Sequence, residues 1–303
     1  MKNQIFEHKG VEIVDTYAEM FPMWAARLII TAESMNWALT AARSATGYAT
    51  SIIGSPAESG IECKVKSDTT PDSRQGVIIQ IYHTSRRQLK NQMVSRIGQC
   101  ILTCPTTAVF DGLSSSPRKI RAGASLRYFG DGFEKKSELS GRTVWNIPVM
   151  ESNFVIEESF GIKKAVAGGN LLIMATNEES ALNAAENAIR EIKKVPGIIA
   201  PFPGGICRSG TKIGSRHYKL KASTNTAFCP TLKENVEGSL VPIGVNSIYE
   251  LVINGLNLKS VKDAMAKGIQ AAVSSTDVVR ITSANYGGKL GPYKAYLKQL
   301  IIP

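Results

Sequence analysis

Apolar and polar residues follow the same arrangement twice along this chain. An apolar run at 27–32 precedes an alanine-rich segment at 37–42, and a similar run at 170–175 precedes a similar segment at 180–185. An apolar run leading into an alanine-rich amphipathic segment is typical of a buried strand followed by a helix. The repetition predicts two similar lobes, and clefts between lobes are favoured places for ligands.

The two copies also keep the same internal spacing. Ile173 follows Ile30 by 143 positions (173 − 30), and Ala181 follows Ala38 by 143 positions (181 − 38). Each copy then passes through an apolar run into a corner rich in proline and glycine, the second of which is at 198–205. We therefore treat the repeat as a property of the fold rather than as a chance similarity.

A second strand and a second helix follow each corner. Apolar runs at 76–82 and 247–253 predict the strands, and apolar residues at every fourth position predict one buried face on each helix, namely Leu89, Met93, Ile97 and Ile101 in the first and Val261, Met265 and Ile269 in the second. Each half thus has the order β-α-β-β-α-β. This order predicts an α+β fold of two ferredoxin-like lobes, related by internal duplication.

The lobes are expected at 1–148 and 149–303, with polar insertions around 64–74 and 208–237. At 303 residues the chain can form two cores of about 150 residues each. A hydrophobic content of 43% is typical of a globular protein, and no apolar run approaches the roughly 18 residues that cross a bilayer. We expect a cytoplasmic protein without a signal peptide or a membrane partner.

The formal net charge of +11 has three candidate explanations: nucleic acid, an anionic membrane surface, or an anionic small substrate. Basic residues are scattered, and no strand interleaves them with aromatic residues as RNA-reading strands do. Ferredoxin-like lobes are nevertheless also the fold of RNA-recognition modules. A solvated basic surface without a specific ligand would have the same composition.

The five cysteines are odd in number and lack CxxC spacing, which argues against a disulfide framework or a zinc ribbon. Cys100 and Cys104 stand four residues apart at a predicted helix end, but no third or fourth ligand is near them in the sequence. We favour buried structural thiols over a metal site, and we predict no metal.

Four stretches carry residues that packing alone does not require, and from them we predict the substrate-binding residues. They are Ser55, Pro56 and Glu58; Thr103, Cys104, Pro105, Thr106 and Thr107; Pro203, Gly204 and Gly205; and Tyr286, Gly287, Gly288 and Lys289. Hydroxyls and free backbone N–H groups at 103–107 can bind a carbonyl or an anion, although an ordinary helix end with local hydroxyl bonds has the same sequence. The glycines at 204–205 and 287–288 allow a ligand to approach the backbone.

Glu250 is the candidate for proton transfer. On the strand at 247–253 it shares one face with Ile248 and Val252, because side chains alternate along a strand. A carboxyl group between two apolar neighbours loses water, which raises its pKa and suits it to proton transfer near neutral pH. The alternative is an edge position in which the carboxylate stays in water or pairs with a lysine.

Known catalytic motifs are absent from the chain: it has no GxSxG elbow, P-loop, HExxH or dinucleotide fingerprint. With only three histidines, a Ser-His-Asp triad is also disfavoured. Transfer of an activated one-carbon unit, between substrates that supply their own nucleophile, fits this set of residues.

The stretches described above resemble the formylmethanofuran–tetrahydromethanopterin N-formyltransferase family. The resemblance spans nearly the entire chain and is carried by long runs, which are 10–22, 45–58, 99–111, 128–136, 161–164, 201–205 and 285–291. It departs at 71–76, where Pro-Asp-Ser-Arg-Gln-Gly stands in place of the expected Pro-Asp-Gly-Arg-Pro-Gly.

The resemblance implies a reversible, cofactor-free transfer of a formyl group between methanofuran and N5 of tetrahydromethanopterin in one-carbon metabolism. The family's catalytic glutamate falls on Glu250. Our own mechanistic hypothesis adds Asn246 as a residue that orients the substrate. A tetrahedral intermediate would form, and the stretch from Thr103 to Thr107 would stabilise its oxygen. The family also implies a homodimer or homotetramer, with sites at lobe and subunit boundaries.

The resemblance gives the net charge a better explanation, because methanofuran carries carboxylates and tetrahydromethanopterin carries a phosphate that a basic surface would attract. Members of the family from salt-rich thermophilic methanogens are often strongly acidic instead, so salt-dependent assembly and activation are not expected here. Two alternatives stay open. One is a subunit of a larger formyltransferase/hydrolase complex that depends on its partners, and the other is a nucleic-acid-binding protein with two RRM-like lobes.

Overall fold

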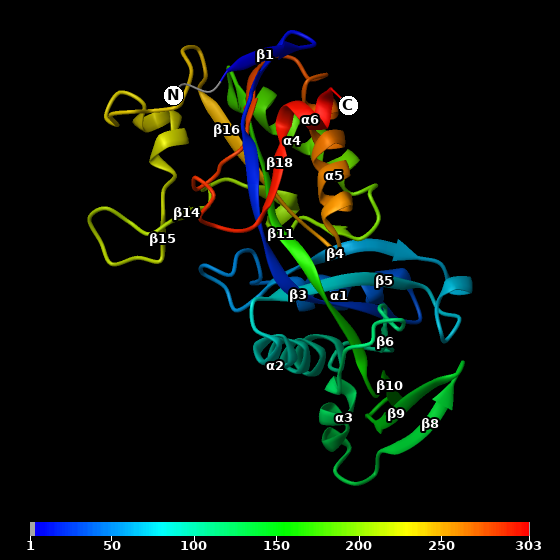
Figure 1. Cartoon of the computed structure of the whole chain (residues 1–303). Coiled ribbons are helices and arrows are strands. Elements are labelled where there is room, and N and C mark those ends of the chain that lie inside the picture. Colours follow the sequence, from blue (N-terminus) through cyan, green and yellow to red (C-terminus); the bar gives the residue numbers. More distant parts are fainter. Residues whose placement is uncertain (1–3, 303) are drawn as a thin grey trace. The chain divides into compact units, whose positions relative to one another are not determined.

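The computed structural model describes residues 4–302. The chain forms two compact units. One comprises residues 23–164, and the other joins the N-terminal residues up to Pro22 to the chain from Ala165 onward. Both division points fall inside long strands, β3 (Tyr17–Thr31) and β11 (Phe160–Ala175), which appear in blue and green in Figure 1.

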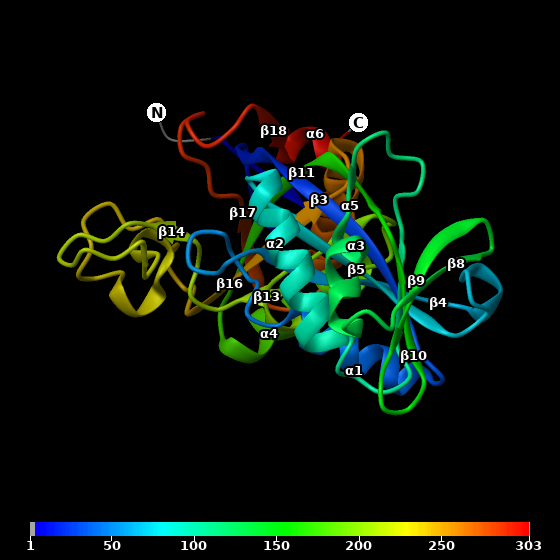
Figure 2. The same cartoon turned by 90° about the horizontal axis from the view of Figure 1, so that it is seen from below.

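The unit 23–164 contains an antiparallel sheet in the order β4-β5-β3-β6. On the β6 side the sheet continues through β10, which is parallel to β6, and then through β9 and β8. The helices α1 and α2 cover one face, and α2 lies beside α3 in Figure 2. The further elements of this unit are β4 (Glu58–Val65), β5 (Gly76–His83), β6 (Ala108–Asp111), β7 (Lys119–Ile120), β8 (Lys135–Leu139), β9 (Arg142–Pro148), β10 (Asn153–Glu157), α1 (Met35–Thr46), α2 (Arg86–Arg96) and α3 (Ala122–Leu126).

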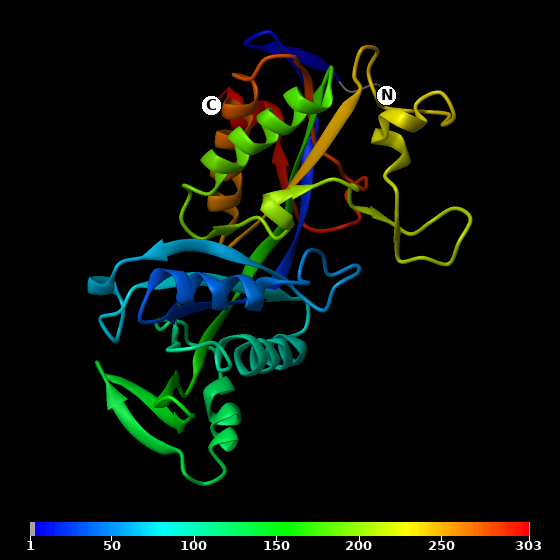
Figure 3. The same ribbon diagram turned by 180° about the vertical axis from the view of Figure 1, so that it is seen from behind.

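The other unit repeats this strand order. Its antiparallel sheet runs β17-β11-β16, and the short strands β12 and β13 pair with the free edge of β16. The helices α4 and α5 lie side by side on one face (Figure 3). The elements of this unit are β1 (Ile5–His8), β2 (Val11–Val14), β12 (Ile198–Ile199), β13 (Ile206–Cys207), β14 (Lys212–Ile213), β15 (Ala222–Ser223), β16 (Ser247–Gly255), β17 (Val278–Thr282), β18 (Tyr293–Tyr296), α4 (Glu178–Ile192), α5 (Leu258–Ala272) and α6 (Leu297–Ile301).

The positions that carry the predicted repeat have matching places in the structure. Ile30 and Ile173 are fully buried in strands, and Ala38 and Ala181 are fully buried in the helices that follow. The seven apolar residues predicted to form the inner faces of the second helices are also buried. The overall fold is therefore mixed α+β, as the sequence predicts.

The residues that cap the helices occupy corresponding positions in the two halves of the chain. The side chains of Ser34 and Asn177, 143 positions apart (177 − 34), each accept a hydrogen bond from a backbone N–H in the first turn of their helix. Ser85 and Asn257 do the same for the second pair of helices, at a spacing of 172 (257 − 85). These caps satisfy N–H groups that have no partner within the helix, so each marks a helix start.

The two compact units differ from the predicted division at 148/149. The N-terminal hairpin of β1 and β2 belongs with the second half of the chain, because β2 pairs in parallel with β17. Residues 149–164 stay with the first half, because β10 pairs with β6. Hydrophobic periodicity predicts where strands lie in the sequence but not which strands pair. The N-terminal hairpin and residues 149–164 were therefore assigned to lobes by sequence position alone.

The predicted insertions are irregular, as expected. The segment 208–237 (yellow in Figure 1) contains only the two-residue strands β14 and β15 and short 3-10 turns. Among the described helices, none has the length and apolar character needed to cross a membrane.

The helix caps predict a measurable loss of stability. Asn177→Ala and Asn257→Ala should each lower the free energy of unfolding by about 1 kcal/mol, because each leaves a first-turn N–H without its acceptor. The measurement is denaturant unfolding followed by circular dichroism. Asn183→Ala, at an exposed position inside α4, is the matched control and should not lower stability. Equal losses in all three variants would contradict the assignment of the caps.

Candidate active site

The two faces of β16 have different surroundings. Leu251 and Ile253 point into the core under α4 and α5. Ile248, on the opposite face, packs near Leu172, Met174 and other residues away from those helices. Because side chains alternate along a strand, Glu250 lies on this second face together with Ile248.

Glu250 is buried, with only 1% of its surface exposed. One carboxyl oxygen, Oε1, accepts a hydrogen bond from the Thr211 hydroxyl at 2.7 Å, and the Thr211 backbone also hydrogen bonds to this group. The other oxygen, Oε2, is buried without a hydrogen-bond partner among residues 4–302. Burial raises the pKa of Glu250 to about 7, although the hydrogen bonds from Thr211 oppose this shift.

The desolvation of Glu250 predicted from its neighbours is thus confirmed. The alternative, an edge position with the carboxylate in water, is wrong, since β13 and β11 pair on either side of β16 at this residue. A carboxyl group with a pKa near 7 and one unpartnered oxygen is suited to accept and return a proton at neutral pH.

The predicted stretch at 203–205 leads directly to Glu250. Pro203–Gly205 forms a 3-10 turn that continues into β13, in which Cys207 stands opposite Glu250. Gly204 and Gly205 both have positive φ, at 65° and 96°, which a side chain would strain. Burial raises the pKa of the Cys207 thiol, and the nearby Glu250 contributes to the shift. Cys207 is therefore a buried thiol of low reactivity, whereas Cys100 and Cys104, which we expected to be buried, are only partly buried.

Tyr286 connects the predicted stretch at 286–289 to the same place. Its hydroxyl donates to the backbone carbonyl of Thr211 at 2.7 Å, so Thr211 is held on one side by Tyr286 and binds Glu250 on the other. Burial, and then the proximity of Glu250 and Glu19, raise the pKa of Tyr286. Gly287, Gly288 and Lys289 are exposed in the loop that follows.

Glu19, around which this loop is wrapped, is not among the residues predicted from the sequence. Glu19 is fully buried and accepts hydrogen bonds from the backbone N–H groups of Tyr286, Gly288, Leu290 and Gly291. The glycine-rich loop was visible in the sequence, but nothing there indicated which of the chain's glutamates it would enclose.

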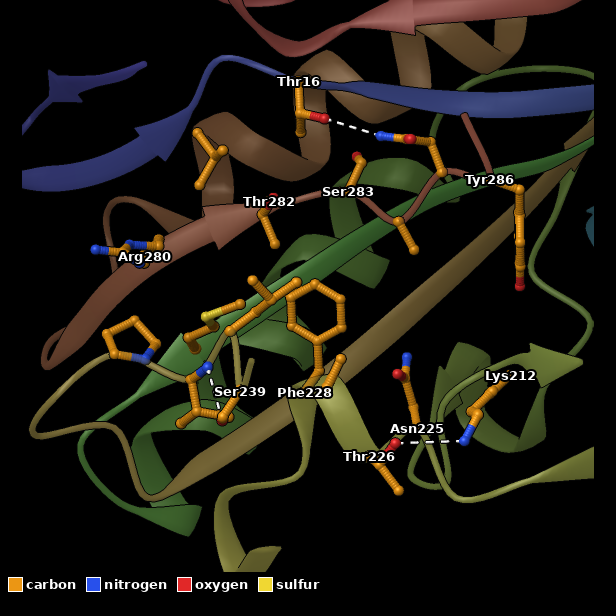
Figure 4. A pocket seen from close by; sticks show the side chains of 18 of the residues that line it. Thr16, Lys212, Asn225, Thr226, Phe228, Ser239, Arg280, Thr282, Ser283 and Tyr286 are labelled. Carbon is orange, nitrogen blue, oxygen red and sulfur yellow. Dashed lines mark hydrogen bonds between the residues drawn. The ribbon is translucent and has the colours of Figure 1, made fainter. Parts of the chain in front are cut away.

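A cavity of about 930 Å³ opens beside Tyr286 (Figure 4), and Glu250 is not among the residues that line it. Met174 and Thr282 form part of its floor, and Tyr286 and Lys212 line it, next to the residues that contact Glu250. Its charged side chains are all basic, namely Lys212, Arg216 and Arg280. Glu12 forms an ion pair with Arg280 at 2.6 Å, while Lys212 donates to the Thr226 hydroxyl at 3.3 Å. An anionic group fits this lining best.

Asn246, the other predicted catalytic residue, is exposed at the beginning of β16. Its side-chain amide donates to the Thr176 carbonyl at 3.0 Å. Four residues of extended strand cover about 13 Å, so Asn246 and Glu250 do not reach the same atom. The structure assigns Asn246 a local structural bond, and its role toward a substrate stays a prediction.

The predicted stretch at 55–58 is held by local hydrogen bonds within the unit 23–164. The Ser55 hydroxyl donates to the carbonyls of Ser51 and Ala57, and Glu58 accepts from the Ile52 backbone N–H at 2.9 Å. Pro56 stands between these two anchored residues. The stretch forms a rigid corner, and its contact with a substrate stays a prediction.

The hydroxyl groups at 103–107 are also occupied locally. Thr103 donates to the Gln99 carbonyl, and Thr107 donates to the carbonyls of Ile101 and Cys104. The Thr106 backbone N–H donates to Glu151, and its hydroxyl accepts from the Glu33 backbone N–H. Pro105 lies between these groups. This is the capped helix end that we considered as the alternative, so the geometry does not favour these donors for stabilising a developing oxyanion.

Within residues 4–302, no group of three or more His, Cys, Asp or Glu side chains is placed to hold a metal ion.

Two family models together match almost the whole chain. Residues 6–149 match the model described as formylmethanofuran-tetrahydromethanopterin formyltransferase, and residues 152–300 match the one described as the proximal lobe of this enzyme. The chain belongs to this family. Its assignment to the formyltransferases makes it an enzyme that transfers one-carbon groups.

Relatives and solved structures of the same family match this chain along almost its full length. The formyltransferase of Methanocaldococcus jannaschii is 51% identical over 298 residues, which cover 97% of this chain and 99% of the relative. The solved formyltransferase of Methanosarcina barkeri is 48% identical, with a TM-score of 0.94 over 98% of this chain and 100% of its own. A chain of the formyltransferase/hydrolase complex FhcABCD from Methylorubrum extorquens, solved with methylofuran, is 42% identical, with a TM-score of 0.93 over 98% of this chain and 99% of its own.

The raised pKa of Glu250 predicts how the stability of this formyltransferase depends on pH. Between its ordinary value of 4.5 and about 7, the folded state keeps a proton that the unfolded state releases, so stability falls as the pH rises through this range. Glu250→Gln removes this dependence. At pH 8 the variant should be more stable than the parent by up to about 3 kcal/mol, and at pH 4 the difference should vanish.

Urea unfolding at pH 4, 6 and 8 measures this effect. Glu7→Gln, an exposed glutamate on β1, is the matched control and should show the same pH dependence as the parent. A difference between Glu250→Gln and the parent that does not change with pH would contradict a raised pKa at Glu250.

Proposed function

We propose that this chain transfers a formyl group reversibly between formylmethanofuran and N5 of tetrahydromethanopterin, with Glu250 carrying the proton. The observation that supports this role most strongly is the buried Glu250 carboxyl, which has a pKa of about 7 and an unpartnered Oε2. Membership in the formyltransferase family supplies the reaction and the names of both carriers.

The proposed reaction balances with Glu250 alone as the acid and base. N5 of the pterin attacks the formyl carbon, the carbonyl electrons move to oxygen, and a tetrahedral intermediate forms. The Glu250 carboxylate takes the proton from N5 and returns it to the methanofuran nitrogen as the carbon–nitrogen bond breaks. In the reverse direction the same steps run backward, so one carboxyl group with a pKa near neutrality serves both directions.

We propose that one of the anionic carriers occupies the cavity beside Tyr286. Lys212 and Arg216 line it, and either a carboxylate or a phosphate would find positive charge there. The turn at 203–205 and the loop at 286–289 are close enough to Glu250, through Cys207 and Thr211, to belong to the same site.

The proposal extends to the architecture, the oligomeric state and the lack of a cofactor. The β-α-β-β-α-β order of each half favours two ferredoxin-like lobes related by duplication. We propose a homodimer or homotetramer in the cytoplasm that works without a cofactor, as the family resemblance implies. Family membership also favours an enzyme over a protein that binds nucleic acid or a membrane.

Replacing Glu250 with Gln should lower kcat by about 10²- to 10⁴-fold, because the amide has the same shape but cannot accept the proton from N5. The measurement is an ultraviolet assay of the formylated pterin, with the circular dichroism spectrum confirming that the variant folds. Glu7→Gln should retain the parent activity. Near-normal turnover of Glu250→Gln would refute the role given to this residue.

The second candidate function is that of a subunit that depends on its partners. It is favoured by the likeness to a chain of the FhcABCD complex. The purified chain, mixed with formylmethanofuran and tetrahydromethanopterin and no other protein, should turn over rapidly if it acts alone. A folded oligomer without turnover would support the second candidate instead.

A further inference from the structure

The Glu19 carboxylate accepts four hydrogen bonds from the backbone of one loop. Its Oε2 accepts from the backbone N–H groups of Tyr286 at 2.8 Å and Gly288 at 3.0 Å. Its Oε1 accepts from those of Leu290 and, at 3.0 Å, Gly291. Both oxygens are therefore used, and the side chain is fully buried.

This arrangement favours the ionised form of Glu19. Burial by itself would raise the pKa of this carboxyl, but the four N–H groups lower it, and the net shift is downward. Backbone N–H groups that converge in this way form a nest, which usually binds an anion from outside the chain. Here the anion is a side chain of β3, so the nest fixes the loop to the sheet.

The loop at 286–291 also packs closely against the backbone of β3. A Cβ atom on Gly291 would lie 2.3 Å from the carbonyl oxygen of Met20 and 2.7 Å from Phe21, so only glycine permits this approach. Asn285, at the start of the loop, donates to the Thr16 hydroxyl at 3.0 Å. The backbone of Tyr286 is consequently fixed between two anchors, Thr16 just before β3 and Glu19 within it.

From this fixed backbone, Tyr286 reaches the residue that binds Glu250. Figure 4 shows its side chain extending from the loop toward the strand of Lys212. The hydroxyl donates to the Thr211 carbonyl at 2.7 Å, and the Thr211 hydroxyl donates to Glu250 Oε1 at 2.7 Å. Thr211 lies in the irregular insertion at 208–237, which has few regular hydrogen bonds of its own to hold it there.

We propose that Glu19 is a positioning residue for formyl transfer: by binding the 286–291 loop, it holds Tyr286, which holds Thr211 against Glu250 Oε1. Glu250 Oε2 is then the oxygen left for the substrate. This inference rests on the proposed function of Glu250. Glu19 itself makes no contact with the reacting atoms and acts only through the loop.

The variants Glu19→Gln, Tyr286→Phe and their double mutant test this proposal. The amide of Gln would present N–H donors to two of the loop's own N–H groups, and Phe cannot donate to Thr211. Each single variant should lower kcat at least tenfold with a smaller change in KM. The double mutant should be no slower than the slower single variant, because both act through the same contact.

The pH profile of kcat distinguishes positioning from a general loss of structure. The hydrogen bonds from Thr211 lower the pKa of Glu250, so releasing Thr211 should raise it further. The acidic limb of the profile should therefore shift to higher pH in both single variants. Glu7→Gln is the matched control, with the parent's kcat and profile.

Three results would overturn the proposal: a parent-like kcat and profile in Glu19→Gln, fully multiplicative losses in the double mutant, or a fall in kcat without a shift of the profile. Glu19→Asp keeps the charge but withdraws it by one methylene and should shift the profile in the same direction. If neither Glu19 variant folds, Glu19 is a structural residue and the proposal fails. Glu250→Gln, assayed in parallel, separates the two claims, because full activity there refutes the proposed function itself.

Discussion

The burial of one carboxyl group is the constraint on which the functional part of this structure depends. Removing Glu250 from water makes its ionised form costly, and the hydrogen bonds from Thr211 compensate for part of that cost. The surrounding elements supply this environment: β11 and β13 cover both edges of the strand, and Ile248 and Leu172 make the same sheet face apolar. A less complete enclosure would leave an ordinary carboxylate that stays ionised at neutral pH.

The two copies of the sequence pattern share one strand order, and the second copy supplies the chemistry of this site. Glu250 pairs with Leu172, and the residues at the matching positions of the first copy are Ile78 and Ile29, which pair in the same way. An isoleucine thus occupies the place of the glutamate in the first copy. The second copy also has the irregular insertion that carries Thr211 and the loop that carries Tyr286. These two segments lie outside the repeat, and they supply the side chains around Glu250.

The sequence was most informative where the physical cause is local. Helices and their buried faces follow from apolar spacing, and the desolvation of Glu250 follows from its two neighbours along the strand. The nest around Glu19 was not predictable in this way, because its hydrogen bonds join residues more than 260 positions apart. At 103–107 the sequence allowed both a binding loop and a capped helix end, and only the positions of the hydroxyl groups favour the second.

The most direct test of this account is to observe the protonation of Glu250 itself. Infrared difference spectra of the parent protein against Glu250→Gln, recorded from pH 4 to pH 9, isolate the carbonyl stretch of the protonated carboxyl group. We predict a band that disappears with a midpoint of about 7, as burial requires. A midpoint near 4.5, the ordinary value for a glutamate, would contradict the account, because Glu250 would then be ionised throughout the neutral range and poorly suited to return a proton.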